Sequence, residues 1–298
     1  MIKRVRKAIF PVAGLGTRLL PATKSIPKEM ITVVDRPLIQ YAVDEAREAG
    51  VEQLIFVTGR GKAALVDYFD VAFELEATMS SKGKNLDVLA PSRASFGEIV
   101  TVRQQQPLGL GHAVWCAREI VGDEPFAVLL PDELMLGKPN CLKQMVEAYD
   151  RVGGNVVAAL EVPESETHQY GVIDPGASDG RLTEIRGMVE KPAPGTAPSN
   201  IMLPGRYILQ PEVMRELDRQ ETGAGGEIQL TDAMARLIGR QPFNAFLFDG
   251  RRHDCGSAAG FVIANLAMAL EREDIAPSVR DYLQSSLSRS DGEGDRFA

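Results

Sequence analysis

The sequence contains little cysteine and no excess of positive charge. Its 298 residues include three cysteines and three histidines. The number of cysteines is odd, and Cys116, Cys141 and Cys255 show no C-x-x-C spacing. Both observations argue against a disulfide framework or a cysteine zinc site, and they fit a reduced, cytoplasmic protein. The net charge of −8 argues against nucleic acid as a partner. Any recognition of phosphate must therefore be local.

Long hydrophobic runs are also missing. The N-terminal segment is basic and then apolar, but Pro11 interrupts the run after a few residues. It is too short for a signal sequence or a membrane span, so we expect no membrane association and interpret this segment as the first strand. The 44% hydrophobic content of the chain is enough to bury a large core, as one big domain or two small ones.

Apolar runs typical of strands alternate with helical patterns in the first half of the chain. Strands are predicted at Lys7–Val12, Gln53–Thr58, Ile99–Arg103 and Phe126–Leu130. Helices are predicted at Pro37–Gly50, Gly111–Ile120 and Asn140–Val152. This order indicates βαβ units and a parallel sheet covered on both faces, in which ligands bind at the carboxyl ends of the strands.

The second half mixes strand patterns with loops rich in proline and glycine. Strands are predicted at Asn155–Val162, Leu182–Val189, Arg206–Leu209 and Asn244–Phe248. We expect them to form a mixed sheet continuous with the first. A helix is predicted from Ala258 to about Glu273, and the polar tail, residues 285–298, is predicted to be disordered.

A glycine-rich loop, GLGTRLLPATKSIPKEM, follows the first strand. Gly14 and Gly16 permit a tight turn that exposes backbone N–H groups. The same loop carries the cations Arg18, Lys24 and Lys28. The spacing fits neither the dinucleotide fingerprint nor the P-loop, because the third glycine of the one and the G-K-[ST] of the other are absent. The loop indicates a polyphosphate site, with a surface turn bearing solvated cations as the alternative.

A second glycine-containing segment, VRQQQPLGLGHAV, leads from a strand into a helix. The amide of Gln104 both donates and accepts, as the edge of a nucleobase requires, and Gly109 and Gly111 let a flat ring approach the backbone. A glycine turn with a solvated Gln104 is equally compatible with this segment. We interpret His112 as a structural or capping residue rather than a catalytic base.

Two aspartates follow strand-like runs. Asp132 comes directly after an apolar strand, and Asp254 lies in RRHDCGS. Carboxylates at a strand end, close to a phosphate site, are suited to Mg²⁺, which takes one or two carboxylates together with phosphate oxygens. Glu133 is a competing ligand. A capping or turn role is the alternative for each aspartate alone, and the sequence cannot show that their loops meet.

Two further segments have features of a sugar-phosphate site. Gly171 lies in a strand-like setting where backbone can approach a ligand. Glu190 and Lys191 precede Pro192, and both can reach one ligand only if the chain turns there, because neighbouring strand residues point to opposite faces. An exposed ion pair is the alternative interpretation of this dipeptide.

Taken in order, seven motifs resemble those of the bacterial UTP:glucose-1-phosphate uridylyltransferases, a family of the sugar-nucleotide pyrophosphorylase superfamily. They are GLGTRLLPATKSIPKEM, VRQQQPLGLGHAV, LLPDE, YGVI, VEKP, GGEIQLTDA and DCGS. The resemblance implies an α/β fold, with a Rossmann-like, GT-A-like mixed sheet that is mostly parallel and covered by helices on both faces. It implies one domain over residues 1–284, with a nucleotide-binding part at about 1–135, a sugar-binding part at about 136–256 and a helical part at 257–284.

The resemblance also implies roles for individual residues. Nucleotide binding falls to Ala13, Gly14, Gly16, Thr17, Gln104 and Gly109. Binding of the sugar and its phosphate falls to Gly171, Glu190 and Lys191. The implied catalytic residues are Arg18, Lys28, Asp132 and Lys191, and the implied Mg²⁺ ligands are Asp132 and Asp254. Many relatives have an aliphatic or acidic residue and then a second aspartate after the metal aspartate, where this chain has Glu133 and Leu134.

The implied partners are UTP and glucose 1-phosphate, joined to give UDP-glucose and pyrophosphate by an enzyme that is a homodimer or homotetramer. Two alternatives stand beside this one. A thymidylyltransferase would use dTTP in the same chemistry, and a silent paralogue would bind a UDP-sugar and regulate an active partner. The second is disfavoured, because a silent copy has no chemical need for the implied catalytic residues.

Overall fold

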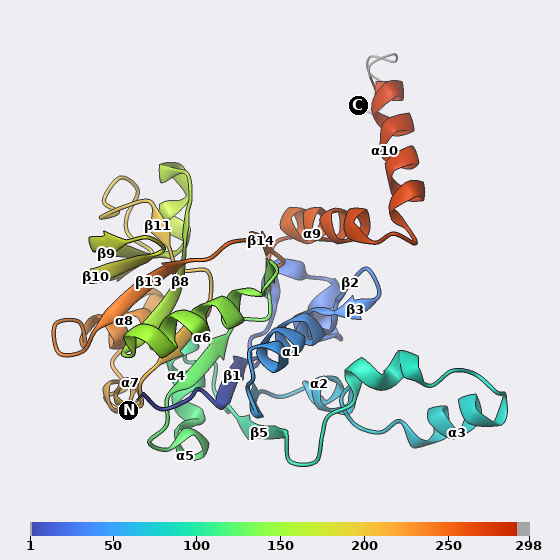
Figure 1. The fold of residues 1–298 in the computed structure, drawn as a ribbon, viewed down its shortest axis with the longest axis horizontal. Helices are drawn as coiled ribbons and strands as arrows, with labels where there is room; N and C mark the ends of the chain where they lie inside the picture. The colour runs from blue at the N-terminus through green and yellow to red at the C-terminus, as the bar shows by residue number, and fades with distance from the viewer. Residues whose placement is uncertain (1, 291–298) are drawn as a thin grey trace.

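The computed structural model describes residues 2–290 and contains, within them, a central sheet of ten strands (Figure 1). In spatial order these are β11 (Ile201–Met202), β9 (Gly171–Asp179), β10 (Leu182–Glu190), β13 (Phe243–Leu247), β8 (Asn155–Glu161), β12 (Arg206–Leu209), β6 (Phe126–Leu129), β1 (Lys7–Pro11), β4 (Gln53–Thr58) and β5 (Ile99–Arg103). Two smaller sheets pair β14 (Arg251–Asp254) with β7 (Glu133–Leu136), and β2 (Thr32–Val33) with β3 (Arg36–Pro37).

The sheet is mixed and continuous across both halves of the chain, as the sequence predicts, but it is less parallel than expected. Parallel pairing joins β1 to β4 and β6, β4 to β5, and β8 to β13. The other ladders are antiparallel, including those of β9 with β10 and of β12 with β6 and β8. The turn between β9 and β10 has only two residues, Gly180 and Arg181. So short a connection forms a hairpin, whereas parallel neighbours need a long crossover.

Helices cover both faces of the sheet. They are α1 (Leu38–Glu48), α2 (Ala63–Asp67), α3 (Phe73–Ser81), α4 (Leu110–Cys116), α5 (Arg118–Val121), α6 (Cys141–Val152), α7 (Glu212–Leu217), α8 (Leu230–Ala235), α9 (Ala258–Glu271) and α10 (Ala276–Ser290). The helix expected over Gly111–Ile120 is divided at Ala117 between α4 and α5.

The core lies in two layers, one on each face of the sheet. Along β1, Ile9 packs into the layer that contains residues of α4, α7 and α8, whereas Ala8 and Phe10 pack into the layer that contains residues of α1 and α6. All three side chains are fully buried. A strand buried on both faces needs no polar alternation, which explains its continuous apolar sequence.

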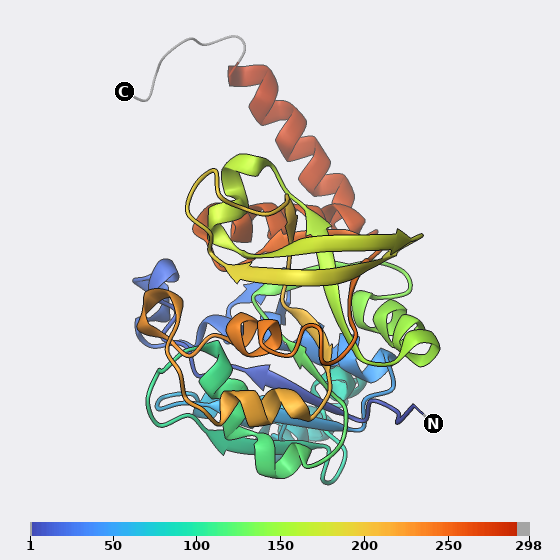
Figure 2. The same cartoon turned by 90° about the vertical axis from the view of Figure 1, so that its left-hand side faces the viewer.

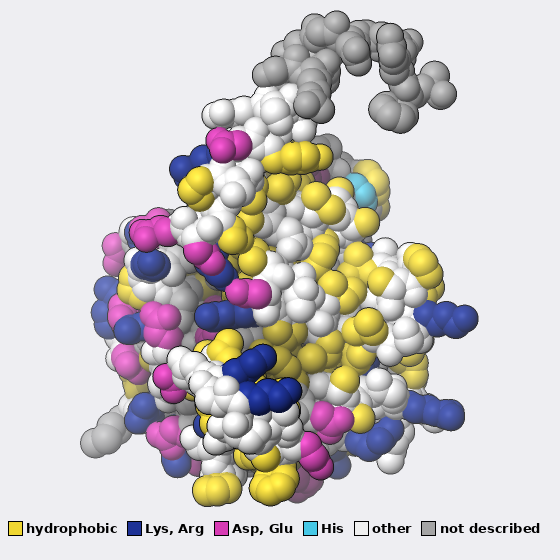
Figure 3. All heavy atoms as spheres, turned by 90° about the vertical axis from the view of Figure 1, so that its right-hand side faces the viewer, with side chains coloured by type: hydrophobic (Ala, Val, Ile, Leu, Met, Phe, Trp, Pro, Cys, Tyr) yellow, Lys and Arg dark blue, Asp and Glu magenta, His cyan; other side chains and the backbone are white. Residues whose placement is uncertain are grey.

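The C-terminal helices extend the chain away from the sheet (Figures 1 and 2). Helix α9 exposes Val262, Ile263 and Leu266, and hydrophobic side chains spread across the side of the molecule that bears α9 and α10 (Figure 3). Helix α10 continues to Ser290, so the tail predicted to be disordered from residue 285 begins as helix. A polar sequence can continue a helix that has already formed, because propagation costs less than nucleation. The rest of that tail, 291–298, lies outside the described residues.

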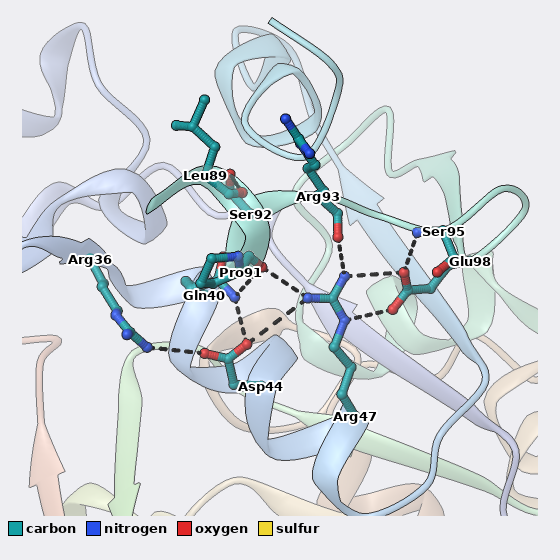
Figure 4. A network of polar contacts seen from close by, with 10 residues as sticks. All are labelled: Arg36, Gln40, Asp44, Arg47, Leu89, Pro91, Ser92, Arg93, Ser95 and Glu98. Carbon is teal, nitrogen blue, oxygen red and sulfur yellow. Dashed lines mark hydrogen bonds and ion pairs between the residues drawn. The ribbon is translucent and has the colours of Figure 1, made fainter. Parts of the chain in front are cut away.

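An arm between β4 and β5 carries α2, α3 and the short 3-10 helix η4 (Asp87–Ser92), and α1 anchors its returning limb (Figure 4). Arg47 of α1 donates to the carbonyl oxygens of Pro91 and Arg93 at 3.0 Å each, and it pairs with Glu98 at 2.6 Å. These bonds satisfy backbone oxygens of a segment without strand partners. Within residues 2–290, no helix is long and apolar enough to cross a membrane.

Candidate functional site

The glycine-rich loop lies at the carboxyl end of β1 and winds through short 3-10 helices. Gly16 has a φ of 67°, and a Cβ there would lie 3.2 Å from the side chains of both Thr23 and Lys28. Only glycine adopts this backbone cheaply and leaves room for that approach. A cavity of about 150 Å³ opens beside the loop. Its lining consists of Gly16, Thr17, Arg18, Leu19, Lys28, Asp132 and Gly256.

Lys28 and Asp132 form an ion pair in this cavity. The two side chains meet at 2.7 Å, and about a fifth of each is exposed, 22% and 23%. Burial is the largest influence and acts to lower the pKa of the Lys28 ammonium, but the charges of Asp132 and Glu29 and the hydrogen bond to Asp132 together outweigh it, so the pKa is raised. Burial is likewise the largest influence on Asp132 and acts to raise its pKa, but the charge and hydrogen bond of Lys28, with smaller effects of a backbone hydrogen bond and Arg18, together lower the pKa. Both groups are therefore charged at neutral pH.

The structure brings Asp254 to Asp132, although 121 positions separate them in the sequence. Strands β7 and β14 pair antiparallel, and Cys255 N donates to Asp132 O at 2.8 Å. A Cβ on Gly256 would lie 3.0 Å from Asp254 Oδ1 and 3.3 Å from Asp132 Oδ2. Arg18 Nη1 would lie 3.5 Å from the same point. We call Arg18, Lys28, Asp132 and Asp254 the phosphate-and-metal cluster.

This arrangement fits Mg²⁺. The missing side chain at Gly256 leaves open the space onto which the two carboxylates converge. No group of three or more histidine, cysteine or acidic residues that could hold a metal occurs among the described residues. Two carboxylates agree with the usual coordination of Mg²⁺, which keeps several waters and takes its remaining ligands from substrate phosphates.

A buried arginine supports the backbone on both sides of Asp132. Arg206 of β12 donates to the carbonyl oxygens of Leu130 at 2.8 Å and Glu133 at 2.7 Å. Its charge is balanced by Glu45 of α1 at 2.9 Å, and the two side chains are only 1% and 5% exposed. A buried ion pair with every hydrogen bond made fixes its neighbours firmly, although it adds little net stability. Arg206 therefore clamps the segment that carries Asp132.

Glu133, the competing metal ligand, forms an ion pair with an arginine. Arg252 of β14 holds its carboxylate with two bonds, at 2.5 and 2.8 Å. Burial raises the pKa of Glu133, although Arg252 opposes that shift. The Arg252 guanidinium also lies over the Tyr170 ring, 4.9 Å from its centroid. Arg252 therefore links Glu133, the neighbour of Asp132 in the phosphate-and-metal cluster, to Tyr170, the residue before Gly171.

Gly171, Glu190, Lys191 and Thr231 form a second group, which we call the sugar cluster. Thr231 Oγ1 donates to Glu190 Oε2 at 2.7 Å, and a Cβ on Gly171 would lie 3.1 Å from that same oxygen. Lys191 has a φ of 46°, a left-handed backbone that is rare outside glycine. The chain thus turns one residue before Pro192, and Lys191 Nζ comes to 3.7 Å from Glu190 Oε1. Strain of this kind is typical of functional positions.

Gln104 and Gly109 lie at the carboxyl end of β5, away from the 150 Å³ cavity. Gln104 is buried, and its amide nitrogen donates to Gly109 O at 3.0 Å. Gly109 has a φ of 109°, and a Cβ there would meet Ile228 O at 2.8 Å. The glycine is therefore required by both its backbone and its neighbour. Ala13 and Gly14 lie at the start of the phosphate loop, and nothing lies within 4 Å of the place a Cβ would take on Gly14.

Sequence reasoning missed several residues that the structure places at these sites: Thr231, Tyr170, Arg252 and Arg206. The segments GGEIQLTDA, YGVI and RRHDCGS carry Thr231, Tyr170 and Arg252, so a signal for these three was available. Nothing local distinguishes Arg206. A cavity of about 850 Å³ between α6 and the β9–β10 hairpin is lined by none of the predicted site residues. Volume alone therefore does not mark the site.

Comparison with known proteins adds a separate line of information. The sequence model of the nucleotidyl transferase family matches residues 7–271. The UTP–glucose-1-phosphate uridylyltransferase of Komagataeibacter xylinus is 49% identical, over 97% of this chain and 100% of that protein. The one of Bacillus subtilis (strain 168) is 46% identical, with the same coverage. A solved UTP-bound UGPase from Acinetobacter baumannii aligns with a TM-score of 0.85 at 43% identity, over 94% of this chain and 99% of that one. A UDP-glucose pyrophosphorylase complexed with UDP-glucose aligns with a TM-score of 0.81 at 42% identity, over 90% of this chain and 100% of that one.

Proposed function

The chain belongs to the UTP–glucose-1-phosphate uridylyltransferase family, and from that premise we propose that it converts UTP and glucose 1-phosphate to UDP-glucose and pyrophosphate. The observation that carries the proposal is the convergence of Arg18, Lys28, Asp132 and Asp254 on one space at the carboxyl edge of the sheet. Two cations and two carboxylates there suit a triphosphate and its metal ion. The sugar cluster, joined to it through Arg252, suits the second substrate.

The proposed reaction is an in-line displacement. An oxygen of the sugar phosphate forms a bond to the α-phosphorus of UTP, while the bond from that phosphorus to the bridging oxygen breaks. The electron pair leaves with pyrophosphate, and no covalent enzyme intermediate is needed. Two anions must meet, so the tasks of the protein are alignment and charge neutralisation. Lys191 would hold the sugar phosphate, and Glu190 would accept hydrogen bonds from sugar hydroxyls.

Lys28 has a partner before any substrate arrives, namely Asp132. We propose that the nucleotide phosphate replaces this carboxylate as the partner of Lys28. The exchange keeps the lysine charged and oriented, and it leaves Asp132 free to act with Asp254. Mg²⁺ held by these two aspartates would supply further positive charge at the phosphate oxygens. Arg18 adds a guanidinium that suits phosphate geometry.

Release of pyrophosphate by the purified chain tests this function. We expect release with UTP, glucose 1-phosphate and Mg²⁺ together, and much slower release when dTTP replaces UTP. Faster release with dTTP would identify a thymidylyltransferase instead. No release with any nucleotide would leave the silent paralogue, which binds a UDP-sugar and performs no chemistry.

We also propose that the protein is a cytoplasmic homodimer or homotetramer. The compartment is supported by the cysteines, Cys116, Cys141 and Cys255, which are all unpaired. The oligomer is supported by the apolar surface of α9, where Val262 and Ile263 are each 57% exposed. Exposed apolar patches on a folded protein commonly mark a subunit contact. Light scattering at micromolar concentration should give the mass of two or four copies, and the mass of a single copy would contradict the proposal.

A further inference from the structure

The amide of Gln104 is held by its nitrogen at two points. Gln104 Nε2 lies 3.0 Å from Gly109 O and 3.0 Å from His112 Nδ1. A carbonyl oxygen only accepts, so the amide group facing Gly109 must be the nitrogen. The second hydrogen of that nitrogen then points to His112, and Nδ1 must accept it. His112 is therefore the neutral tautomer that carries its hydrogen on Nε2.

This arrangement determines what Gln104 offers to a ligand. Both amide hydrogens are used within the protein, and the structure gives no hydrogen bond to Gln104 Oε1 within residues 2–290. The oxygen is the part of the amide that remains, and it can only accept. Uracil carries a hydrogen on N3, whereas N3 of cytosine is itself an acceptor. An accepting oxygen that faces N3 suits uracil and repels cytosine, whose hydrogens on that edge lie on the exocyclic N4 instead.

We propose that His112 is a positioning residue that fixes the amide orientation of Gln104 and so makes the site prefer uracil to cytosine nucleotides. The inference rests on the proposed function and on the expectation from the sequence that Gln104 binds the base. His112 itself does not touch the substrate in this proposal. It acts by accepting the second amide hydrogen. Gln104 then has one orientation in which Gly109 O and His112 Nδ1 both receive a hydrogen bond.

The surroundings of His112 hold its ring in place. The ring stacks on Trp115, with centroids 5.7 Å apart and an angle of 28° between the planes. Trp115 Nε1 donates to Asp218 at 3.0 Å, and the Arg118 guanidinium lies over the Trp115 ring at 3.7 Å. Partial burial lowers the pKa of His112. The ring is thus neutral near pH 7, as its role as an acceptor requires.

The backbone around this pair is fixed by a distant segment. Gly111 N donates to Ile228 O at 2.8 Å, and Ile228 N donates to Leu108 O at 2.8 Å. These bonds hold the turn that carries Gly109 O and the first turn of α4, where His112 lies. Gly109 O, the backbone acceptor of Gln104, therefore keeps its position when the His112 side chain is changed.

Three substitutions of His112 separate hydrogen bonding from packing. His112→Phe keeps a ring that can stack on Trp115 but removes the acceptor. His112→Asn places an amide oxygen where Nδ1 accepts, and it should rescue the function. His112→Ala removes the acceptor without adding bulk, and it serves if the phenylalanine variant folds poorly. The matched control is His168→Phe, a change at an exposed histidine remote from Gln104.

The measurement is kcat/KM for UTP and for CTP, each with glucose 1-phosphate and Mg²⁺. We expect His112→Phe and His112→Ala to lower the UTP to CTP ratio about tenfold, the scale of one lost hydrogen bond. In His112→Asn and His168→Phe, the UTP to CTP ratio should stay within about threefold of the ratio of the unaltered protein. The KM for glucose 1-phosphate should stay unchanged in all four variants.

The outcomes distinguish a failure of this inference from a failure of the proposed function. An unchanged UTP to CTP ratio in both His112→Phe and His112→Ala would overturn the role of His112 and leave the enzyme activity standing. A parallel loss for both nucleotides, with the ratio unchanged, would show a structural role only. If the unaltered protein does not use UTP at all, the proposed function fails, and this inference fails with it.

Discussion

The phosphate-and-metal cluster and the sugar cluster are supported in different ways. Asp132 lies on a segment clamped from below by Arg206, which is 1% exposed. Glu190 instead ends β10, a strand whose pairing with β9 contains two register shifts, and Lys191 follows it. Lys28 is 22% exposed, whereas Lys191 is 50% exposed. The lysine of the first cluster is thus more enclosed than the lysine of the second, although Glu190 itself is only 14% exposed.

In the proposed function the two clusters have different tasks. Neutralising charge in a displacement at phosphorus depends on groups that are already in position, because reorganisation would cost free energy at the transition state. In that function, sugar selection depends on Glu190 reaching several hydroxyls, and the more exposed Lys191 has only to reach the sugar phosphate. We therefore expect substitutions in the first cluster and its support to have larger effects than substitutions in the second.

The largest effect should come from the buried clamp. Arg206→Met removes the partner of Glu45 and the donors to Leu130 O and Glu133 O. Breaking a buried ion pair on one side typically costs about 3–5 kcal/mol, because the remaining charge stays buried and unpaired. Urea denaturation should show a loss of this size in the free energy of unfolding.

Arg181→Met is the matched control for the clamp. Arg181 pairs with Asp249 at 3.0 Å, but the two side chains are 53% and 75% exposed. Exposed pairs contribute about 0–1 kcal/mol, so this variant should unfold nearly like the unaltered protein. Equal losses in the two variants would show that the clamp is no stronger than a surface pair.

The next effect concerns the two aspartates. Asp132→Asn and Asp254→Asn should each lower kcat about a hundredfold or more, the scale on which one preorganised electrostatic contact acts. If both carboxylates hold one ion, the double variant should be much less than multiplicatively worse. A double-mutant cycle on kcat/KM at saturating Mg²⁺ measures this, with circular dichroism to check the fold. Fully multiplicative losses would indicate two independent sites.

The sequence predicted local features of the fold better than long-range ones. The bounds of β4, β5 and β12 match the prediction residue for residue, because their apolar runs end at polar residues or glycine. The pairing of β7 with β14 was not predicted, since no local pattern records which strands meet. The antiparallel β9 was also missed, because its proline, glycines and aspartates do not have the composition of a strand.

The same distinction applies to the site. Gly16 and Lys28 were predictable, because a turn with a left-handed glycine beside cations has a local signature. Arg206 was not, because an arginine beside an apolar run gives no sign that it will be buried against Glu45. The turn that directs Lys191 toward Glu190 needed one fact that the sequence does not contain, the left-handed backbone of a lysine.

A smaller effect is expected in the sugar cluster. Lys191→Ala should raise the KM for glucose 1-phosphate about tenfold while leaving that for UTP within a factor of about two, since a half-exposed charged hydrogen bond contributes the lower part of its usual range. Lys82→Ala, at an exposed position after α3, is the control and should change neither constant. Initial rates with each substrate varied separately give both values. Equal increases in both would remove Lys191 from the sugar phosphate.

The smallest effect should come from Thr231, which in the proposed function would act on the sugar only through Glu190. Thr231→Val keeps the shape but removes the donor 2.7 Å from Glu190 Oε2, so the carboxylate loses one restraint on its orientation. We expect the preference for glucose 1-phosphate over galactose 1-phosphate, measured as a ratio of kcat/KM, to fall about fivefold. Thr183→Val is the matched control, because Thr183 is a buried threonine on β10 that bonds Ser178 instead. A fall in both variants would trace the effect to the hairpin, and a fall in neither would mean that Glu190 needs no help from Thr231 to read the sugar.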